Sequence, residues 1–217
     1  MKIEVASGCW VEYIAGFYDL PEANELLRAF LVLEMTPEVI RMYGADTVTK
    51  RRTEQYGTDY VYNPTAKKAK EWTPLMLGIR ERMERVAGPL DGGLIQLYPD
   101  GSAGIGWHRD KGKPEVIASL SLGAEREFAF GVGPVRTCEE IWRMHLAHGS
   151  LLLIPAETNA ALKHRLPPAG RITDPRVNVT LRRFPRSAAQ VDEGPAPAEQ
   201  AGVGTSRSRS GLPRRAS

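Results

Sequence analysis

From Gly92 to about residue 184, the chain is a series of short runs rich in β-branched and aromatic residues, with turn residues between most of them and no helical pattern. Strands that follow one another without helices cannot form a doubly wound parallel sheet, because each parallel connection needs a long crossover. The pattern therefore predicts an antiparallel sandwich or barrel. The expected strands are 94–98, 104–109, 116–122, 127–131, 140–146, 150–155 and 176–184.

Two amphipathic helices are expected before this region. Asp19 followed by Glu22 forms a capping-box pattern, and apolar residues continue from it at helical spacing to about residue 35. The second helix is expected to have Thr73 as its N-cap and a proline in its first turn, and to end at Gly88. Its apolar stripe is expected to comprise Leu75, Ile79, Met83 and Val86.

The composition is that of a globular domain, since 42% of the 217 residues are hydrophobic and 25% are charged. No apolar run approaches the roughly 20 residues of a membrane-spanning helix, so we expect no membrane segment. The first residues include Glu4, which disfavours a signal peptide. Cys9 and Cys138 are far apart and form neither a disulfide framework nor a zinc motif. We therefore expect a cytoplasmic protein.

The net charge of +3 is concentrated at the end of the chain. Residues 186–217 hold five arginines and three acids, a balance of +2, which leaves 24 basic and 23 acidic residues in the body. A nearly neutral body argues against non-specific binding to long nucleic acid. The last segment has no aromatic residue and is rich in small residues, so it is predicted to be a disordered tail behind a folded domain of residues 1–185.

His108 and Asp110 stand two residues apart at a predicted strand end, so their side chains project from the same face. His164 follows a later β run and can supply a third ligand. Two histidines and one carboxylate leave open positions on a metal, as in non-haem Fe(II) oxygenases. Taken alone, the H-x-D pair is also explained by a strand-end histidine beside a surface aspartate.

The run from Arg176 to Arg182 has polar and apolar residues in strict alternation. Arg176, Asn178, Thr180 and Arg182 share one face, and three aliphatic residues share the other. A strand facing solvent has the same pattern. If the polar face points into the barrel, the two guanidinium groups need anions, and a dicarboxylate such as 2-oxoglutarate supplies one at each end.

Taken in order, these segments resemble the AlkB-like Fe(II)- and 2-oxoglutarate-dependent dioxygenases from about Val11 to Pro185. The resemblance rests on an ordered set of motifs, which is more specific than any one of them. The set is Tyr98-Pro99-Asp100-Gly101, Ile105-Gly106-Trp107-His108-Arg109-Asp110, Ile117-Ala118-Ser119-Leu120-Ser121-Leu122-Gly123, Arg126-Glu127-Phe128, His148-Gly149-Ser150-Leu151-Leu152, His164 with Leu166-Pro167, and R-x-N-x-T-x-R at 176–182.

The resemblance implies a mainly β (α+β) fold. Its core, residues 92–185, would be a double-stranded β-helix, or jelly-roll, with helices and a nucleotide-recognition lid before it. The lid is assigned to residues 41–72. By the same resemblance, the iron ligands are His108, Asp110 and His164.

The resemblance also implies a binding site for 2-oxoglutarate. Arg176 would pair with its distal carboxylate, and Arg182 would lie near the carboxylate that chelates iron. Tyr98 and Asn178 match further cosubstrate contacts. The family's usual N-x-Y stands here as Gln96-Leu97-Tyr98, which keeps the amide on a side chain that is one methylene longer.

The chemistry that the family implies uses Fe(II), 2-oxoglutarate and O2. The cosubstrate is decarboxylated to succinate and CO2 while an N-alkyl carbon of the substrate is hydroxylated and a methyl group is released as formaldehyde. The expected substrate is an alkylated, single-stranded or flipped nucleotide in DNA or RNA. We expect the enzyme to act as a monomer.

The lid contains basic and aromatic residues suited to phosphate contact and base stacking. Arg51 and Arg52 are the candidates for phosphate contact, and Tyr56 and Tyr60 are the candidates for contact with the base. Tyrosines in a β-rich stretch also pack in cores, so a purely structural role is the alternative.

Lys111-Gly112-Lys113 follows the metal motif, where nucleobase-repair members commonly carry an acid. This departure favours one alternative, a dioxygenase of the same chemistry that acts on a protein or a small molecule. The other alternative is a non-catalytic nucleic-acid-binding module. The complete set of predicted metal and cosubstrate residues argues against it.

Overall fold

The computed structural model describes residues 1–42, 45–58 and 68–185. The predicted disordered tail at 186–217 and part of the predicted lid therefore lie outside the described residues. Among the helices of the described part, none is both long and apolar enough to cross a membrane.

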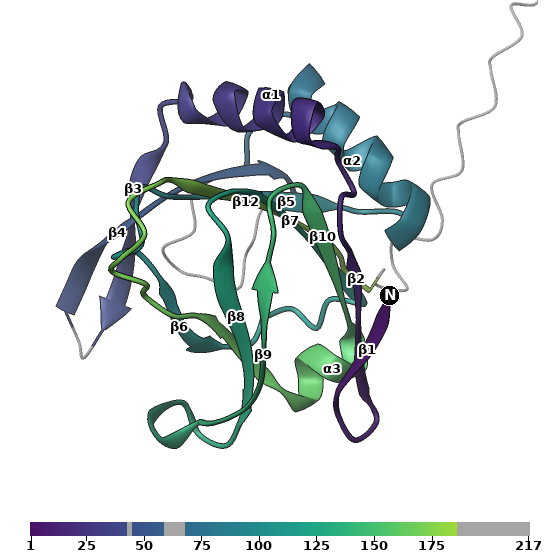
Figure 1. Cartoon of the computed structure of the whole chain (residues 1–217), viewed down its shortest axis with the longest axis vertical. Helices are drawn as coiled ribbons and strands as arrows, with labels where there is room; N and C mark the ends of the chain where they lie inside the picture. Colours follow the sequence, from purple (N-terminus) through teal and green to yellow (C-terminus); the bar gives the residue numbers. More distant parts are fainter. Residues whose placement is uncertain (43–44, 59–67, 186–217) are drawn as a thin grey trace, which may run out of the picture. The chain divides into compact units, whose positions relative to one another are not determined.

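Two antiparallel sheets form the body of the protein (Figure 1). The larger sheet has eight strands in the order β1 (Lys2–Ala6), β2 (Cys9–Ile14), β10 (Ser150–Pro155), β7 (Val116–Gly123), β12 (Arg176–Arg183), β5 (Gly92–Tyr98), β4 (Ala45–Gly57) and β3 (Thr36–Met42). The smaller sheet has four strands in the order β6 (Ile105–His108), β11 (Lys163–Leu166), β8 (Arg126–Val132) and β9 (Glu139–Leu146).

The prediction of an antiparallel β fold is confirmed, and all seven expected strands are present within two residues of their expected ends. The sequence did not reveal the hairpin of β1 and β2, the strand β11, or the short helix α3 (Ala156–Ala161). These elements are only four to six residues long and carry little periodic pattern. Of the predicted lid at 41–72, residues 41–42 belong to β3 and residues 45–57 form β4, and these two strands pair in an antiparallel ladder.

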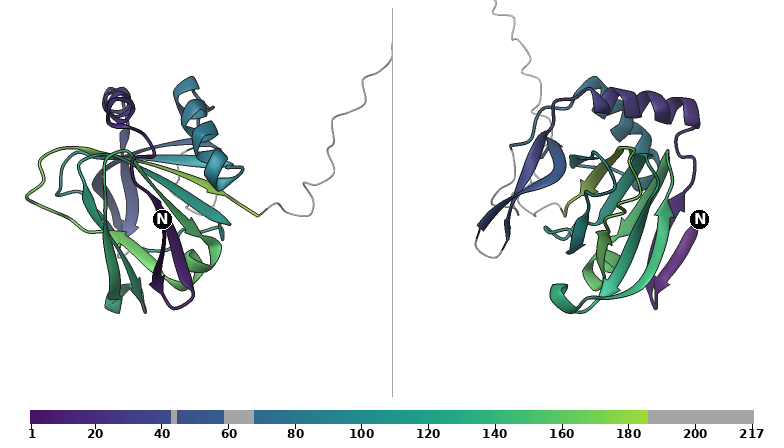
Figure 2. Two further views of the ribbon diagram at one scale, coloured as in Figure 1. Left: turned by 45° about the vertical axis from the view of Figure 1, so that its right-hand side comes forward. Right: turned by 60° about the vertical axis from the view of Figure 1, so that its left-hand side comes forward.

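Helices α1 (Leu20–Leu31) and α2 (Pro74–Ala87) lie on the outer face of the large sheet (Figures 1 and 2). Both predicted caps are present: Asp19 and Glu22 form the two bonds of a capping box, and the Thr73 hydroxyl accepts from Met76 N–H at 3.3 Å. A short 3-10 helix, Val135–Thr137, precedes β9.

Two details of the helices differ from the expectation. α1 ends at Leu31, not near residue 35, because its last turn tightens and the chain enters β3. In α2, Ile79 and Met83 are buried as expected, but Met76 and Ala87 are buried in place of Leu75 and Val86, and Val86 stays 47% exposed.

The large sheet separates two hydrophobic clusters. One cluster lies between this sheet and the two long helices and includes Val177, Val179 and Leu181 of β12. The other includes Ile117, Phe128, Phe130 and Leu166 from both sheets. Both faces of β12 are therefore covered, which excludes the solvent-facing interpretation of its alternating pattern. The polar face of this strand points between the sheets, where it forms a pocket.

Candidate active site

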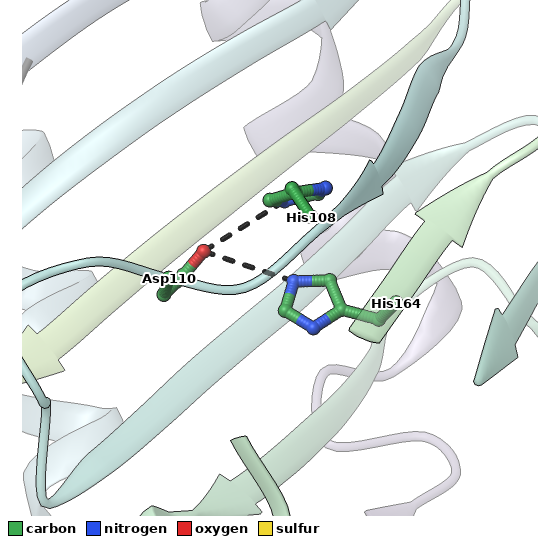
Figure 3. A group of neighbouring side chains, drawn as sticks. All are labelled: His108, Asp110 and His164. Carbon is green, nitrogen blue, oxygen red and sulfur yellow. Dashed lines mark ion pairs between the residues drawn. The ribbon is translucent and has the colours of Figure 1, made fainter. Parts of the chain in front are cut away.

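His108, Asp110 and His164 meet between the two sheets. His108 is the last residue of β6 and lies opposite His164 of β11 in the antiparallel ladder, while Asp110 follows two residues after His108. One possible ligand atom from each residue lies within 4.8 Å of the others. Asp110 Oδ1 is 3.7 Å from Nε2 of each histidine (Figure 3). The ladder register thus brings together two histidines that are 56 positions apart.

The second carboxylate oxygen of Asp110 is held by Arg182. Arg182 Nε donates to Asp110 Oδ2 at 2.6 Å, and both side chains are less than a tenth exposed. Burial alone would raise the pKa of Asp110, but the Arg182 guanidinium and the nearby His164 outweigh this effect and hold it well below its usual range. Asp110 is therefore ionised at neutral pH, with Oδ1 directed towards the histidines.

Both histidines are arranged to present Nε2 to a ligand. His108 Nδ1 lies 2.8 Å from the carbonyl oxygen of Gly106, so this nitrogen carries the proton and Nε2 has a free lone pair. Burial, together with the neighbouring His164, lowers the pKa of His108 to about 3. The ring of His164 stacks on Phe128 at 5.4 Å. Two imidazoles whose Nε2 atoms lie near one carboxylate oxygen are a set of metal donors.

The pocket next to these three residues is lined by polar side chains from β5, β7 and β12. Gln96 and Tyr98 of β5 lie opposite Asn178 and Arg176 of β12 in the ladder. The full lining is Gln96, Tyr98, Ile105, His108, Asp110, Ile117, Ser119, Phe128, Ile154, His164, Leu166, Arg176, Asn178, Thr180 and Arg182. All five predicted cosubstrate residues therefore line the same pocket as the three predicted metal ligands.

Arg176 is a buried cation without a carboxylate among the described residues at ion-pair distance. Its side chain donates to Ser121 Oγ at 2.9 Å and lies over the ring of Tyr98 at 5.3 Å, while its Nε has no hydrogen-bond partner. Burial lowers the pKa of Arg176 to about 10, so the guanidinium remains charged at neutral pH. An unpaired buried charge is costly, and an anionic ligand would compensate it.

Asn178 and Gln96 form a network within the protein. The Asn178 amide donates to Ser119 Oγ and to the Leu120 carbonyl, both at 2.8 Å, and accepts from Thr180 at 2.6 Å and Gln96 at 3.4 Å. These contacts use all the donors and acceptors of the amide. Asn178 thus organises the neighbouring side chains of the pocket that it lines, and its predicted contact with the cosubstrate stays a prediction.

Tyr98 donates its hydroxyl proton to Gln96 Oε1 at 3.1 Å. The two residues are two positions apart on β5 and therefore project from the same face of the strand. The longer side chain at position 96 thus places its amide oxygen where it accepts from Tyr98. This contact gives a role to the residue that departs from the N-x-Y pattern.

The prediction that Tyr56 contacts the substrate base needs correction. Tyr56 is 4% exposed and stacks on Trp72 with ring centroids 6.5 Å apart. It pairs with Gly93 and shares the side of the sheet occupied by Ile95 and Leu97, which lies under the helices. The register between β4 and β5 therefore puts its ring on the side opposite the pocket.

Arg51 and Arg52, the two arginines of the predicted lid, differ in their exposure and in the side of the sheet on which they lie. Arg51 projects to the pocket side of the sheet but is 6% exposed, and its guanidinium pairs with Glu38 of β3. We therefore correct its predicted role as a phosphate contact, because an internal carboxylate takes its charge. Arg52 is exposed, but it pairs with Leu97 of β5 and therefore lies on the same side of the sheet as Tyr56, away from the pocket. Tyr60 lies outside the described residues.

Several residues of the site were given no role from the sequence. Ser119 and Ser121 of β7 support Asn178 and Arg176, and their alternation with leucines is the signal that could have identified them. Asn159 of α3 bonds to the backbone of Asp110. Nothing in the sequence around Asn159 marks this contact, because it depends on the tertiary position of a six-residue helix.

Comparisons with known proteins agree with this arrangement. Residues 11–182 match the model of the 2OG-Fe(II) oxygenase superfamily. DNA oxidative demethylase ALKBH2 of Mus musculus is 36% identical over 161 residues, which are 67% of this chain and 66% of that protein. Alpha-ketoglutarate-dependent dioxygenase alkB homolog 3 of Mus musculus is 32% identical over 183 residues, 77% of this chain and 63% of that protein. The matched region thus spans just under two thirds of each relative.

The fold itself is found among solved structures. The structure of OsALKBH1 superposes with a TM-score of 0.54 at 16% identity and covers 80% of this chain and 97% of that chain. A 2OG-Fe(II) oxygenase family oxidoreductase from Burkholderia pseudomallei gives a TM-score of 0.52 at 12% identity, covering 80% of this chain and 84% of that chain. Together with the match over residues 11–182, these findings show that the chain belongs to the 2OG-Fe(II) oxygenase superfamily, as an AlkB-like member.

Proposed function

We propose that this protein is an Fe(II)- and 2-oxoglutarate-dependent dioxygenase that removes alkyl groups from nucleobases of DNA or RNA. The observation that carries the proposal is the shared pocket, in which His108, Asp110 and His164 face the unpaired buried cation Arg176. The first three residues are suited to a metal ion and the fourth to an anion. O2 would be the second cosubstrate.

The three-residue cluster fits Fe(II) by its donor chemistry. Two neutral imidazole nitrogens and one ionised carboxylate oxygen are the protein ligands of non-haem Fe(II) oxygenases, which leave positions for other ligands. The outer contacts agree with this role: Gly106 fixes the tautomer of His108, and Arg182 holds the Asp110 oxygen that does not face the histidines. His108, Asp110 and His164 would therefore hold the ion.

The polar end of the pocket fits 2-oxoglutarate. Arg176 would pair with its distal carboxylate, because the guanidinium is buried, charged and free of acidic partners among the described residues. Tyr98 borders the same space. Arg182 lies on the metal side, where it already binds Asp110 and would face the carboxylate nearer to the ion.

When bound, iron and 2-oxoglutarate supply the oxidation of an N-alkyl carbon by O2, with succinate, CO2 and an unstable hydroxylated product. The residues of the chain position the reactants. Asp110 stays ionised and His108 stays neutral, so these two ligands remain available at neutral pH. Phe128, Ile117 and Ile154 line the pocket with apolar surface and limit access of water.

The nucleic-acid substrate is supported by the relatives and by the surface beside the pocket. ALKBH2 is named as a DNA oxidative demethylase. A groove that includes Lys50, Gly106 and Arg165 shares Ile105 with the pocket. Exposed Lys50 on β4 borders this groove and is suited to phosphate groups, and the near-neutral body is suited to binding one unpaired nucleotide.

The test is turnover on methylated oligonucleotides. Purified protein with Fe(II), ascorbate and 2-oxoglutarate is incubated with DNA and RNA strands that carry one N-methylated base. We expect equal amounts of succinate, formaldehyde and restored base, and none of them with Asp110→Ala. Lack of repair on every strand, with succinate still formed, would contradict the proposed substrate and retain the chemistry.

That second result would support a dioxygenase of the same chemistry that acts on a protein or a small molecule. The observation that favours this candidate is Lys111-Gly112-Lys113 after the metal motif, with Glu115 as the first acid. A screen of succinate formation against methylated peptides and free methylated nucleosides separates it from the first candidate.

A further inference from the structure

Asp110 lies beyond the end of its strand. β6 ends at His108, which pairs with His164 of β11. The next antiparallel position would bring Asp110 opposite Leu162, but Leu162 N–H bonds to the carbonyl of Thr158 at 2.9 Å and closes helix α3. The peptide groups of Asp110 therefore need another partner, since buried backbone groups rarely stay unpaired.

The side chain of Asn159 takes the place of the missing strand. Asp110 N–H donates to Asn159 Oδ1 at 3.0 Å, and Asn159 Nδ2 donates to the Asp110 carbonyl at 3.0 Å. Asn159 is 4% exposed. Its amide thus makes the same reciprocal pair of bonds that a neighbouring peptide makes in an antiparallel ladder.

Helix α3 has independent anchors on either side of this contact. Thr158 Oγ1 donates to the carbonyl of Trp10 on β2 at 2.7 Å, and Arg109 donates to the carbonyl of Ala161 at 2.8 Å. Asn159 also stands five residues before His164. The helix therefore links the backbone of one metal-ligand residue to the strand that carries another.

We propose that Asn159 is a positioning residue that holds Asp110 in its metal-binding orientation before the ion binds. This inference rests on the proposed function only in taking Asp110 as a ligand. Asn159 fixes the two peptide groups of Asp110, and Arg182 fixes Oδ2. With these three points held, Oδ1 is directed towards both histidines at 3.7 Å.

The first test measures Co(II) binding to metal-free protein by visible absorption. Asn159→Ala removes both bonds, and we expect it to weaken Co(II) binding by about 10- to 100-fold, the usual effect of losing an outer contact of a metal ligand. Asn159→Asp keeps the acceptor for Asp110 N–H and loses the donor. We expect an intermediate loss, although its added negative charge would by itself strengthen cation binding.

The matched control is Thr158→Val, which removes the hydroxyl bond from the adjacent residue of the same helix to Trp10. We expect it to lower the melting temperature of the metal-free protein without changing Co(II) affinity by more than about twofold. A purely structural role of α3 predicts the opposite, that Thr158→Val and Asn159→Ala weaken Co(II) binding together in proportion to their loss of stability.

A second readout needs no metal. Hydrogen exchange of the Asp110 amide in the metal-free protein should accelerate at least about tenfold in Asn159→Ala and stay unchanged in Thr158→Val. Co(II) binding by Asn159→Ala within twofold of the wild type, or unchanged exchange of the Asp110 amide, would overturn the proposal. If the wild type binds no Co(II), the proposed metal site fails, and amide exchange still decides whether Asn159 holds Asp110.

Discussion

Arg182 Nε donates to Asp110 Oδ2 at 2.6 Å in the interior of the protein, where the two side chains are 9% and 7% exposed. The bond divides the carboxylate into two functional halves. Oδ2 is occupied by the guanidinium, and Oδ1 is left to face His108 and His164. A residue predicted to serve the cosubstrate therefore also sets the orientation and charge of a proposed metal ligand.

This pair predicts a large loss of stability when Arg182 is replaced. Arg182→Met leaves a buried carboxylate without its main counter-charge, which costs about 3–5 kcal/mol in comparable pairs. Urea unfolding of the metal-free protein measures this loss. The control is Arg143→Met, because the bonds of Arg143 to Glu127 and Glu140 are on the surface, and its replacement should cost less than about 1 kcal/mol. Equal losses for the two variants would contradict the account.

Arg176 predicts opposite effects on stability and on cosubstrate binding. Arg176→Met removes a buried cation that has no acidic partner among the described residues, so the metal-free protein should be unchanged or more stable in urea. The same change should weaken 2-oxoglutarate binding by at least about 100-fold, because a desolvated charge pair with the ligand is lost. Calorimetric titration measures the second effect. Wild-type affinity in this variant would exclude Arg176 from the cosubstrate site.

The hydrogen bond between Tyr98 and Gln96 predicts that the two residues act together on 2-oxoglutarate binding. In this structure the Tyr98 hydroxyl donates its proton to Gln96 Oε1, so this hydroxyl is not available to donate to a ligand carboxylate. The shorter side chain of Gln96→Asn should withdraw this acceptor and strengthen 2-oxoglutarate binding by about tenfold, the contribution of one charge-assisted hydrogen bond. In a Tyr98→Phe background the same change should have no effect. A gain of equal size in both backgrounds would show that residue 96 acts independently of Tyr98.

The lowered pKa of His108 predicts that the free energy of unfolding decreases in acid. His108 has its pKa lowered to about 3, whereas an unfolded histidine titrates near 6.5. Between these values the unfolded chain binds a proton that the folded protein does not, so stability falls as the pH is lowered from about 6.5, by up to about 1.4 kcal/mol per unit. The low pKa of Asp110 adds a further loss below about pH 4.

The measurement is urea unfolding of metal-free protein at several pH values between 4 and 7, compared with His108→Gln. The variant cannot take up this proton, so its stability should fall less steeply between pH 6.5 and 4. Parallel curves for the two proteins would show that His108 is protonated in the folded state or that other groups account for the whole dependence.

The main features of the fold, and the meeting of His108 and Asp110 with His164, could be predicted from short-range patterns and from the order of the motifs. The spacing of His108 and Asp110 and the alternation along 176–182 each fix which side chains share a face. The caps at Asp19 and Thr73 are likewise local. His164 is far from this pair in the sequence, and only the order of the motifs identified it as the third predicted ligand.

The errors arose where long-range pairing decides the outcome. Tyr56 and Arg51 lie on opposite sides of β4, and only the register with β5 shows which side faces the pocket. The Glu38 partner of Arg51 comes from the neighbouring strand. Asn159 acts through a helix placed by contacts with β2, so its role is visible only in the folded protein.

The most direct test of the central claim, that one pocket holds both iron and 2-oxoglutarate, is an anaerobic titration without any substrate. Addition of 2-oxoglutarate to the protein with Fe(II) should produce a weak visible charge-transfer band. The band should be absent in Asp110→Ala, and Arg176→Met should require far more 2-oxoglutarate to reach it. A protein that binds Fe(II) and gives no band at saturating 2-oxoglutarate, or a band that persists in Asp110→Ala, would contradict the claim.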